Sequence, residues 1–175
     1  MALRGPNRLR YRFLVKALDL DVFRAPCQRN VQGFLYIGER TSLQVGNEQD
    51  DDRLAWKSSI GFLHFDREWD MPWAFARLLA LFCHKRVLRK MRYIREGWFV
   101  DVYQGMLTGI VIAEREILSA NECVRLPDWL PDAENATDWL TDRLLVRFQA
   151  TRSIVAPPDF SRPIRDELRE YAKSH

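Results

Sequence analysis

The chain has 175 residues, of which 47% are hydrophobic and 12% aromatic, and its formal net charge is +3. This composition excludes a disordered chain and predicts one folded domain that is large enough to bury a core. No apolar run is long enough to span a bilayer and no hydrophobic leader is seen, so we expect a cytoplasmic protein without a membrane partner. Three widely spaced cysteines indicate neither a disulfide framework nor a zinc site.

A first strand is predicted over residues 8–16, where charged and apolar residues alternate. Arg8, Arg10 and Arg12 share one face of it, because successive side chains of a strand point to opposite sides of the sheet. Residues 1–30 as a whole carry seven basic and two acidic side chains, a net charge of +5. They contain no nucleic-acid-binding motif, so a nucleic-acid partner is not expected.

Alternation returns over residues 60–69, where His64, Asp66 and Glu68 lie on one face of a predicted strand. A polar, acidic turn is predicted before it, at residues 47–52. After it, Asp70-Met71-Pro72 opens a helix that runs to about Cys83, with the aspartate as the candidate N-cap. This helix is apolar nearly all round, which predicts that it is buried against the outside of a sheet.

Charged and apolar residues also take turns in three short runs, at residues 88–93, 98–103 and 110–117. Lys90 and Arg92 share one strand face, and Glu114 and Glu116 share another. One interpretation is an ordinary half-buried sheet with its charges in water. The other is an antiparallel barrel with a charged lumen, in which opposite charges or an anionic ligand lie against these paired like charges.

The C-terminal part is predicted to hold two helices. A helix or helical turn over residues 135–146 ends the domain, and a second, charged helix follows Pro157-Pro158 and reaches about Lys173. We therefore expect a domain at residues 1–147 and a tail with a short helix at residues 148–175.

Four segments together resemble the second half of a CYTH domain, the triphosphate tunnel family that includes inorganic triphosphatase, thiamine triphosphatase and class IV adenylate cyclase. The family pattern is approximately K-T-R-Y, D-x-F-x-G, E-V-E and a P-x-W-hydrophobic close. The corresponding segments here are Lys90-Met91-Arg92-Tyr93, Asp101-Val102-Tyr103-Gln104-Gly105, Glu114-Arg115-Glu116 and Pro127-Asp128-Trp129-Leu130. The resemblance implies an α+β fold, an antiparallel eight-stranded β-barrel or tunnel with flanking helices.

Earlier segments extend this resemblance to most of the chain. Gln32-Gly33-Phe34-Leu35 is similar to the family's Q-G-Y-L, with a strand expected next at residues 41–45. Arg53-Leu54-Ala55-Trp56-Lys57 is similar to its L-T-I-K strand, which puts Lys57 at the lysine position. Asp66 and Glu68 match the acids of its R-x-E-x-E strand, while His64 replaces the arginine.

Two departures from the family pattern concern charge. The N-terminal E-x-E-x-K signature falls on Arg8, Arg10 and Arg12, so two acids are replaced by arginines. The R-x-R of the second strand falls on Ser42-Leu43-Gln44, so both arginines are missing there. Arginine stays protonated and cannot become a metal ligand.

The resemblance implies a phosphate site and a metal site but no catalytic residue that we can name. The expected Mg²⁺ or Mn²⁺ site is impaired because of the arginines, and the residues left for it are Glu68, Asp101, Glu114 and Glu116. The expected phosphate-binding residues are Arg8, Arg10, Arg12, Lys57, Lys90 and Arg92.

Over the matched positions, six basic residues face five acidic ones once Asp66 is counted. Two arrangements stay open. The cations either form internal ion pairs with the acids or converge on an open cavity. Ser42 and Gln44 are smaller than the arginines they replace, which favours the open cavity.

We therefore expect a divergent member that binds a triphosphate-containing anion, namely inorganic triphosphate, a nucleotide or thiamine triphosphate. Its metal-dependent phosphohydrolase activity is expected to be weak or lost. If it is active, the resemblance favours a triphosphatase over a cyclase. The alternative is an inactive scaffold, a pseudoenzyme with the same fold that recruits a protein partner.

Overall fold

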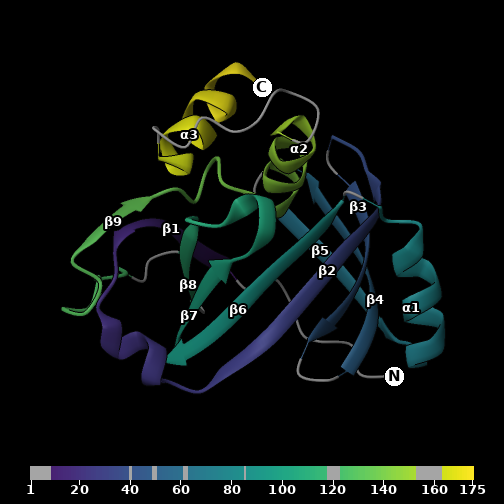
Figure 1. Cartoon of the computed structure of the whole chain (residues 1–175), viewed down its shortest axis with the longest axis horizontal. Coiled ribbons are helices and arrows are strands. Elements are labelled where there is room, and N and C mark those ends of the chain that lie inside the picture. The colour runs from purple at the N-terminus through teal and green to yellow at the C-terminus, as the bar shows by residue number, and fades with distance from the viewer. Residues whose placement is uncertain are drawn as a thin grey trace. The chain divides into compact units, whose positions relative to one another are not determined.

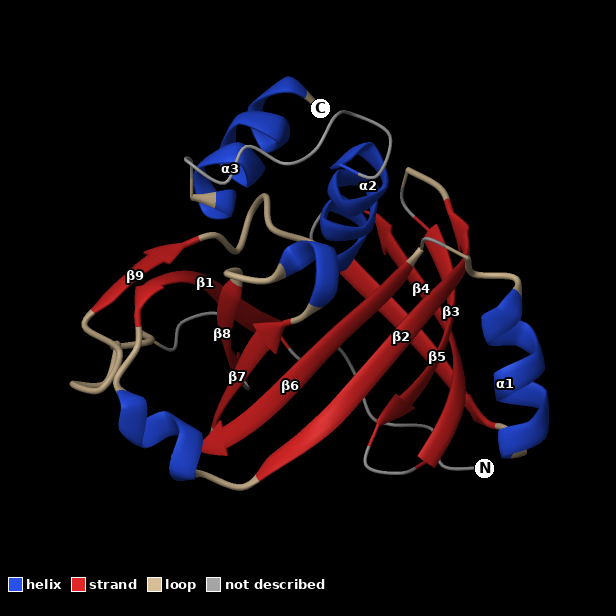
Figure 2. Cartoon of the chain, in the orientation of Figure 1, coloured by secondary structure: helices blue, strands red, loops and turns tan. Residues whose placement is uncertain are grey.

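The computed structural model describes residues 9–39, 41–48, 51–60, 63–84, 86–117, 123–152 and 163–175. Only the backbone is described at residues 9, 47–48, 51–53, 56–60, 63–68 and 73. These parts contain nine strands and three α-helices, all strands pairing antiparallel where a register is defined (Figures 1 and 2). The fold is α+β, as the sequence predicts. The described residues fall into two compact units.

The first described unit, residues 29–89, contains four strands in the order β5-β4-β3-β2. Each of these strands pairs antiparallel with its neighbour in the chain. Their bounds are β2 Cys27–Ile37, β3 Thr41–Glu48, β4 Asp51–Ile60 and β5 Leu63–Asp70. Strands β3 and β4 occupy much of the segment in which the sequence predicted a turn at residues 47–52.

Helix α1, Trp73–Leu81, packs against β3 and β4 through only one of its sides. Ala76 and Cys83 are buried there beside Val45. Cys83, just after α1, lies so close to β2 that a Cβ atom at Gly33 would be 2.6 Å from its Sγ. A residue with a side chain would clash there, which explains why position 33 is a glycine. The residue that caps the helix is Pro72, whereas Asp70 ends β5, so the prediction of Asp70 as N-cap is wrong.

The helix lies against the sheet as predicted, but it is less buried than its nearly all-round apolar sequence indicated. Four large apolar side chains on it or just after it are between 50% and 70% exposed, namely Phe75, Leu78, Leu81 and Phe82. A helix of nine residues presents only a stripe to the sheet that it covers, and the apolar residues outside that stripe stay at the surface.

The second unit, residues 8–28 and 90–175, contains the other five strands in the order β6-β7-β8-β1-β9, apart from the first three residues of β6. The pairings in it place Arg10 opposite Glu116, Arg12 opposite Glu114 and Arg92 opposite Asp101. The strand bounds are β1 Leu9–Ala17, β6 Val87–Arg95, β7 Trp98–Tyr103, β8 Val111–Ile117 and β9 Asp132–Asn135.

The strands of the second unit have an apolar face and a charged face. The apolar face forms a core in which Phe13 packs on Trp98 at 5.7 Å between ring centres and Trp98 on Trp129 at 6.3 Å. Val22 of the 3₁₀ helix η1, Leu20–Arg24, closes this core. Because side chains alternate along a strand, burial of this face sends Arg10 and Arg12 to the other one.

Two α-helices complete the second unit: α2, Asp142–Arg152, and α3, Ile164–Ser174. They pack together through Phe148 and Tyr171, whose ring centres are 5.5 Å apart. The predicted charged C-terminal helix is present as α3. The helix or helical turn predicted over residues 135–146 is present in part: β9 ends at Asn135, a helical turn follows in which the backbone N–H of Leu140 donates to the carbonyl oxygen of Ala136 at 2.8 Å, and α2 begins at Asp142. The division between a domain and a tail after residue 147 stays a prediction, and that boundary lies inside α2.

The structure differs from the expected eight-stranded barrel or tunnel in its strand number and in the closure of the sheet. Nine strands are present among the described residues, and β5 and β9 are the two ends of the strand order. No hydrogen-bonded pairing joins these two strands in the described part of the chain, so hydrogen bonds do not close the sheet. None of the described helices has the length and apolar character needed to cross a membrane.

Candidate functional site

The charged face of the second unit brings together side chains from four strands and one helix. Arg10 and Arg12 come from β1, and Glu114 and Glu116 from the paired strand β8. Strands β6 and β7 add the remaining strand residues, Lys90, Arg92 and Asp101, and α2 adds Asp142. These eight side chains are called the charged cluster below.

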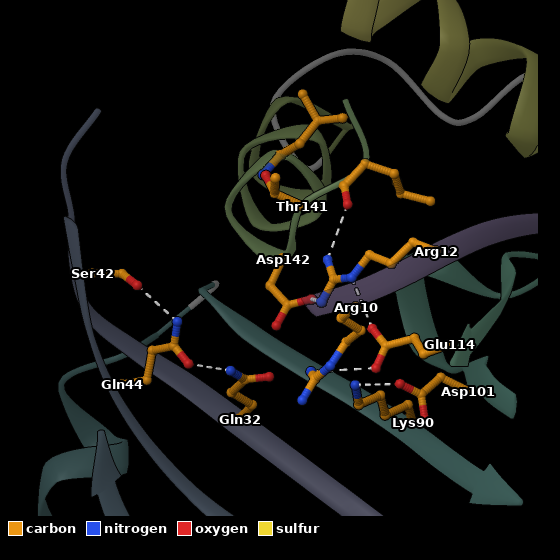
Figure 3. Close-up of polar contacts among 12 residues, drawn as sticks. Arg10, Arg12, Gln32, Ser42, Gln44, Lys90, Asp101, Glu114, Thr141 and Asp142 are labelled. Atoms are coloured by element: carbon orange, nitrogen blue, oxygen red, sulfur yellow. Dashed lines mark hydrogen bonds and ion pairs between the residues drawn. The ribbon is translucent and has the colours of Figure 1, made fainter. Parts of the chain in front are cut away.

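Glu114 connects several members of the charged cluster, and only 1% of its side chain is exposed; Figure 3 shows it beside Arg10 and Arg12. Its Oε1 accepts from Arg12 Nε at 2.8 Å. Its Oε2 lies 3.4 Å from Arg10 Nη1 and 3.3 Å from Arg92 Nη2. One carboxylate therefore joins guanidinium groups of two strands.

Asp101 is the second buried carboxylate and is fully shielded from solvent. Lys90 Nζ donates to its Oδ2 at 2.5 Å (Figure 3). Arg92 Nε donates to its Oδ1 at 2.7 Å. Charge-assisted bonds of this length are among the strong ones in proteins. They fix the positions of both predicted phosphate-binding residues of β6.

Asp142, which the sequence did not identify, anchors Arg12 from the other side. Arg12 Nη2 lies 3.0 Å from Asp142 Oδ1, and its Nη1 donates to the carbonyl oxygen of Leu140 at 3.0 Å (Figure 3). Thr141 precedes Asp142 and accepts a bond from the backbone of Leu144 at 3.2 Å. A Thr-Asp pair is typical of a helix start, which is the only signal that the sequence offers for this contact.

The charged cluster holds four cationic and four carboxylate side chains, and its two most buried carboxylates are kept ionised. Burial by itself would raise the pKa of Asp101, but Lys90 and Arg92 outweigh it and hold that pKa below the ordinary 3.8. Burial likewise opposes ionisation of Glu114, yet Arg12 and Arg10 keep its pKa below the ordinary 4.5. The formal charges of the four cations and four carboxylates cancel.

These lowered pKa values predict a loss of stability in acid. The unfolded chain takes up protons at the ordinary pKa values, before the folded chain does, so the stabilisation is complete above about pH 5 and falls as the pH drops through the folded pKa values. We expect a lower free energy of unfolding by urea at pH 3 than at pH 6. Glu114→Gln should reduce this difference, and equal pH dependence in the variant and the wild type would contradict the assignment.

Arg10 is the most accessible cation of the charged cluster, with 37% of its side chain exposed. It bonds Glu116 at 2.8 Å, and Glu116 is 23% exposed. The sequence left open whether the first-strand arginines pair with Glu114 and Glu116 or face an open cavity unpaired. The structure shows the ion pairs, so the preference for unpaired cations is wrong for the residues of this unit.

Several predicted site residues lie outside what the structure describes: Arg8 altogether, and the side chains of Lys57, Asp66 and Glu68. The first unit does describe Ser42 and Gln44, which occupy the positions of the family's two arginines. Both are buried, and Gln44 donates to Ser42 at 2.7 Å and accepts from Gln32 (Figure 3). Neutral amide and hydroxyl groups there satisfy one another.

A divalent cation does not fit the carboxylates that the structure describes. No three His, Cys, Asp or Glu side chains converge among the described residues in a way that could hold a metal. Asp101, Glu114 and Glu116 each already accept from lysine or arginine. The guanidinium of Arg10 reaches both Glu114 and Glu116, so a positive charge already occupies their shared environment.

Tyr103, also missed by the sequence analysis, is buried beside the charged cluster. Its hydroxyl has no hydrogen-bond partner among the described residues. A buried hydroxyl left in this state costs about 1–3 kcal/mol. Such a group calls for a physical explanation.

The fold and the site define an antiparallel α+β protein in which one face of the strands carries interlocked arginines, lysines and carboxylates. The chain is 33% identical over 105 residues to an inorganic triphosphatase of Acetivibrio thermocellus, a match that covers 57% of this chain and 67% of the relative. It belongs to the CYTH family, the triphosphate tunnel proteins. The family resemblance predicted from the sequence is confirmed.

Solved structures agree on the fold. That of the inorganic triphosphatase NE1496 matches with a TM-score of 0.59 and 19% identity, covering 81% of this chain and 95% of that one. A structure of the hypothetical protein NE1496 matches with a TM-score of 0.57 and 19% identity, covering 80% and 97%. No family model matches the sequence.

Proposed function

We propose that the chain binds a triphosphate-containing anion on the charged cluster: inorganic triphosphate, a nucleotide or thiamine triphosphate. The observation that carries this proposal is the convergence of four cationic side chains from β1 and β6 on one strand face, Arg10, Arg12, Lys90 and Arg92. Sequence similarity to an inorganic triphosphatase supports a triphosphate-related function.

Binding has to compete with the internal carboxylates, because every one of these cations is ion-paired. Arg10 is the natural first contact, since it is the most exposed cation and one of its partners, Glu116, is itself partly exposed. Glu116 can turn toward solvent and leave the guanidinium fork to phosphate oxygens, whose geometry it matches. Glu114 then stays held by Arg12 and Arg92.

Metal-dependent hydrolysis by this chain is proposed to be weak or lost. Mg²⁺ or Mn²⁺ prefers a set of oxygen ligands without a competing cation among them. The guanidinium of Arg10 stands close to Glu114 and Glu116 and repels such an ion. Turnover that persists would be of the triphosphatase type, the cleavage of a phosphoanhydride bond.

A second candidate is an inactive scaffold that recruits a protein partner. It is favoured by the balance of the charged cluster, four cations against four carboxylates, which leaves no net attraction for an anion. The two candidates differ in one simple property, namely whether tripolyphosphate binds at all.

Thermal unfolding in EDTA, with and without tripolyphosphate, tests the proposal. A ligand at 100 times its Kd stabilises a protein by about 2.7 kcal/mol, so the midpoint of the wild type should rise by several degrees. Arg10→Gln should lose most of this rise. Arg24→Gln is the matched control, because Arg24 is an exposed arginine of the same unit that pairs only locally with Asp21 in the described contacts. No rise in the wild type at millimolar tripolyphosphate would favour the scaffold.

A further inference from the structure

Tyr103 is the last residue of β7 and shares a strand face with Asp101, two positions before it. It pairs with Lys90 across the sheet, and Lys90 Nζ lies 5.5 Å from the centre of its ring. Only 2% of Tyr103 is exposed. The ring therefore lies on the face of the charged cluster rather than in the apolar core on the opposite face.

The hydroxyl of Tyr103 lies in the electrostatic field of the cluster but bonds none of its members. Burial raises the pKa of Tyr103 well above its ordinary value, and the nearby carboxylates of Asp142 and Asp101 raise it further. The group therefore keeps its proton at any working pH. No described side chain or backbone atom accepts that proton in a hydrogen bond.

This makes Tyr103 different from every other donor of the cluster. Arg10, Arg12, Lys90 and Arg92 each have to give up or share a carboxylate before they can bind another anion. A neutral hydroxyl without a partner has no bond to give up. A hydrogen bond that it makes to an incoming acceptor is therefore a net gain.

We propose that the Tyr103 hydroxyl donates a hydrogen bond to a non-bridging phosphate oxygen of the bound triphosphate, and thus positions that phosphate beside Lys90 and Arg12. This inference rests on the proposed function. A charged phosphate oxygen fits because it accepts strongly, carries no proton to donate at neutral pH, and is drawn to the same place by the neighbouring cations.

A consequence is that the Tyr103 hydroxyl should recognise the phosphate groups of a ligand and not the nucleoside or other group attached to them. Tripolyphosphate and ATP both present such oxygens, so both should depend on Tyr103 to a similar degree. A hydroxyl that recognised a base or a sugar would affect ATP alone.

Calorimetric titration of tripolyphosphate and ATP in EDTA, with wild type and Tyr103→Phe, tests the inference. The phenylalanine keeps the ring over Lys90 and removes only the oxygen. We expect Kd to rise about tenfold for both ligands, the effect of losing one hydrogen bond to a charged acceptor. The melting temperature of the ligand-free protein should stay the same or rise slightly, because no internal bond is lost.

Tyr11→Phe is the matched control, since Tyr11 lies in the same unit but packs on the apolar face against Phe13. It should leave Kd unchanged. An unchanged Kd for Tyr103→Phe, with or without a fall in melting temperature, overturns the inference and leaves the proposed function standing. An increase confined to ATP also overturns it. Absence of binding by the wild type refutes both the role of Tyr103 and the proposed function.

Discussion

Replacing Glu114 by glutamine should lower the free energy of unfolding by about 3 kcal/mol. The side chain is almost fully buried and accepts from Arg10, Arg12 and Arg92. Glutamine keeps the shape but removes the charge, so buried guanidinium groups are left with one carboxylate fewer. The loss stays at the lower end of the range for broken buried pairs, because Arg12 keeps Asp142 and Arg92 keeps Asp101. Urea unfolding followed by tryptophan fluorescence measures it.

Glu116→Gln is the matched control for this experiment. It makes the same chemical change on the same strand, two residues further on, but at a carboxylate that is 23% exposed and pairs with the half-exposed Arg10. Pairs at such accessible positions contribute about 1 kcal/mol or less. If the two variants lose equal stability, Glu114 is not the centre of a buried ion-pair network.

Arg10→Glu should convert a metal-repelling site into one that a divalent cation stabilises. The change places a third carboxylate beside Glu114 and Glu116 and removes the guanidinium that joins them. Like-charge repulsion should cost about 2 kcal/mol, or about 4–8 °C in the melting temperature for a chain of this size. Mg²⁺ or Mn²⁺ should recover most of that loss, because such ions bind clustered carboxylate oxygens. Melting curves in EDTA and in millimolar Mg²⁺ provide the measurement.

Arg10→Gln separates the effect of losing the guanidinium from the effect of gaining a carboxylate. It removes the cation without adding a carboxylate, so a smaller loss of stability and little recovery by Mg²⁺ are expected. Equal stabilisation of wild type and Arg10→Glu by Mg²⁺ would show that Arg10 does not block the metal, and the account of an impaired site would fail.

The alternation of charged and apolar residues was enough to predict which side chains share a face. Arg10, Arg12, Lys90, Arg92, Glu114 and Glu116 do lie together, because the buried core of Phe13, Trp98 and Val100 takes up the opposite side of the strands. The two-residue period of a strand fixes this arrangement, since a slip by one residue would move the charged side chains into the apolar core and the apolar side chains onto the charged face.

Pairing between charges could not be predicted in the same way. Whether Arg12 faces Glu114 or solvent depends on strand register, which the sequence does not state. Asp142 lies 130 positions from Arg12 in the chain, and no periodic pattern links the two. The exposed side of α1 was missed for a related reason, because an apolar helix is buried only where a second element is present to cover it.

The most direct test of the whole account is one calorimetric titration of tripolyphosphate into the wild-type protein, in EDTA and again in Mg²⁺. We predict binding in EDTA, a weaker affinity when salt screens the cations, and no sustained heat of hydrolysis when Mg²⁺ is added. An ordinary enzyme turns over at about 1 to 10³ per second. Absence of binding in EDTA, together with turnover in that range in Mg²⁺, would contradict both the metal-free anion site and the impaired metal site.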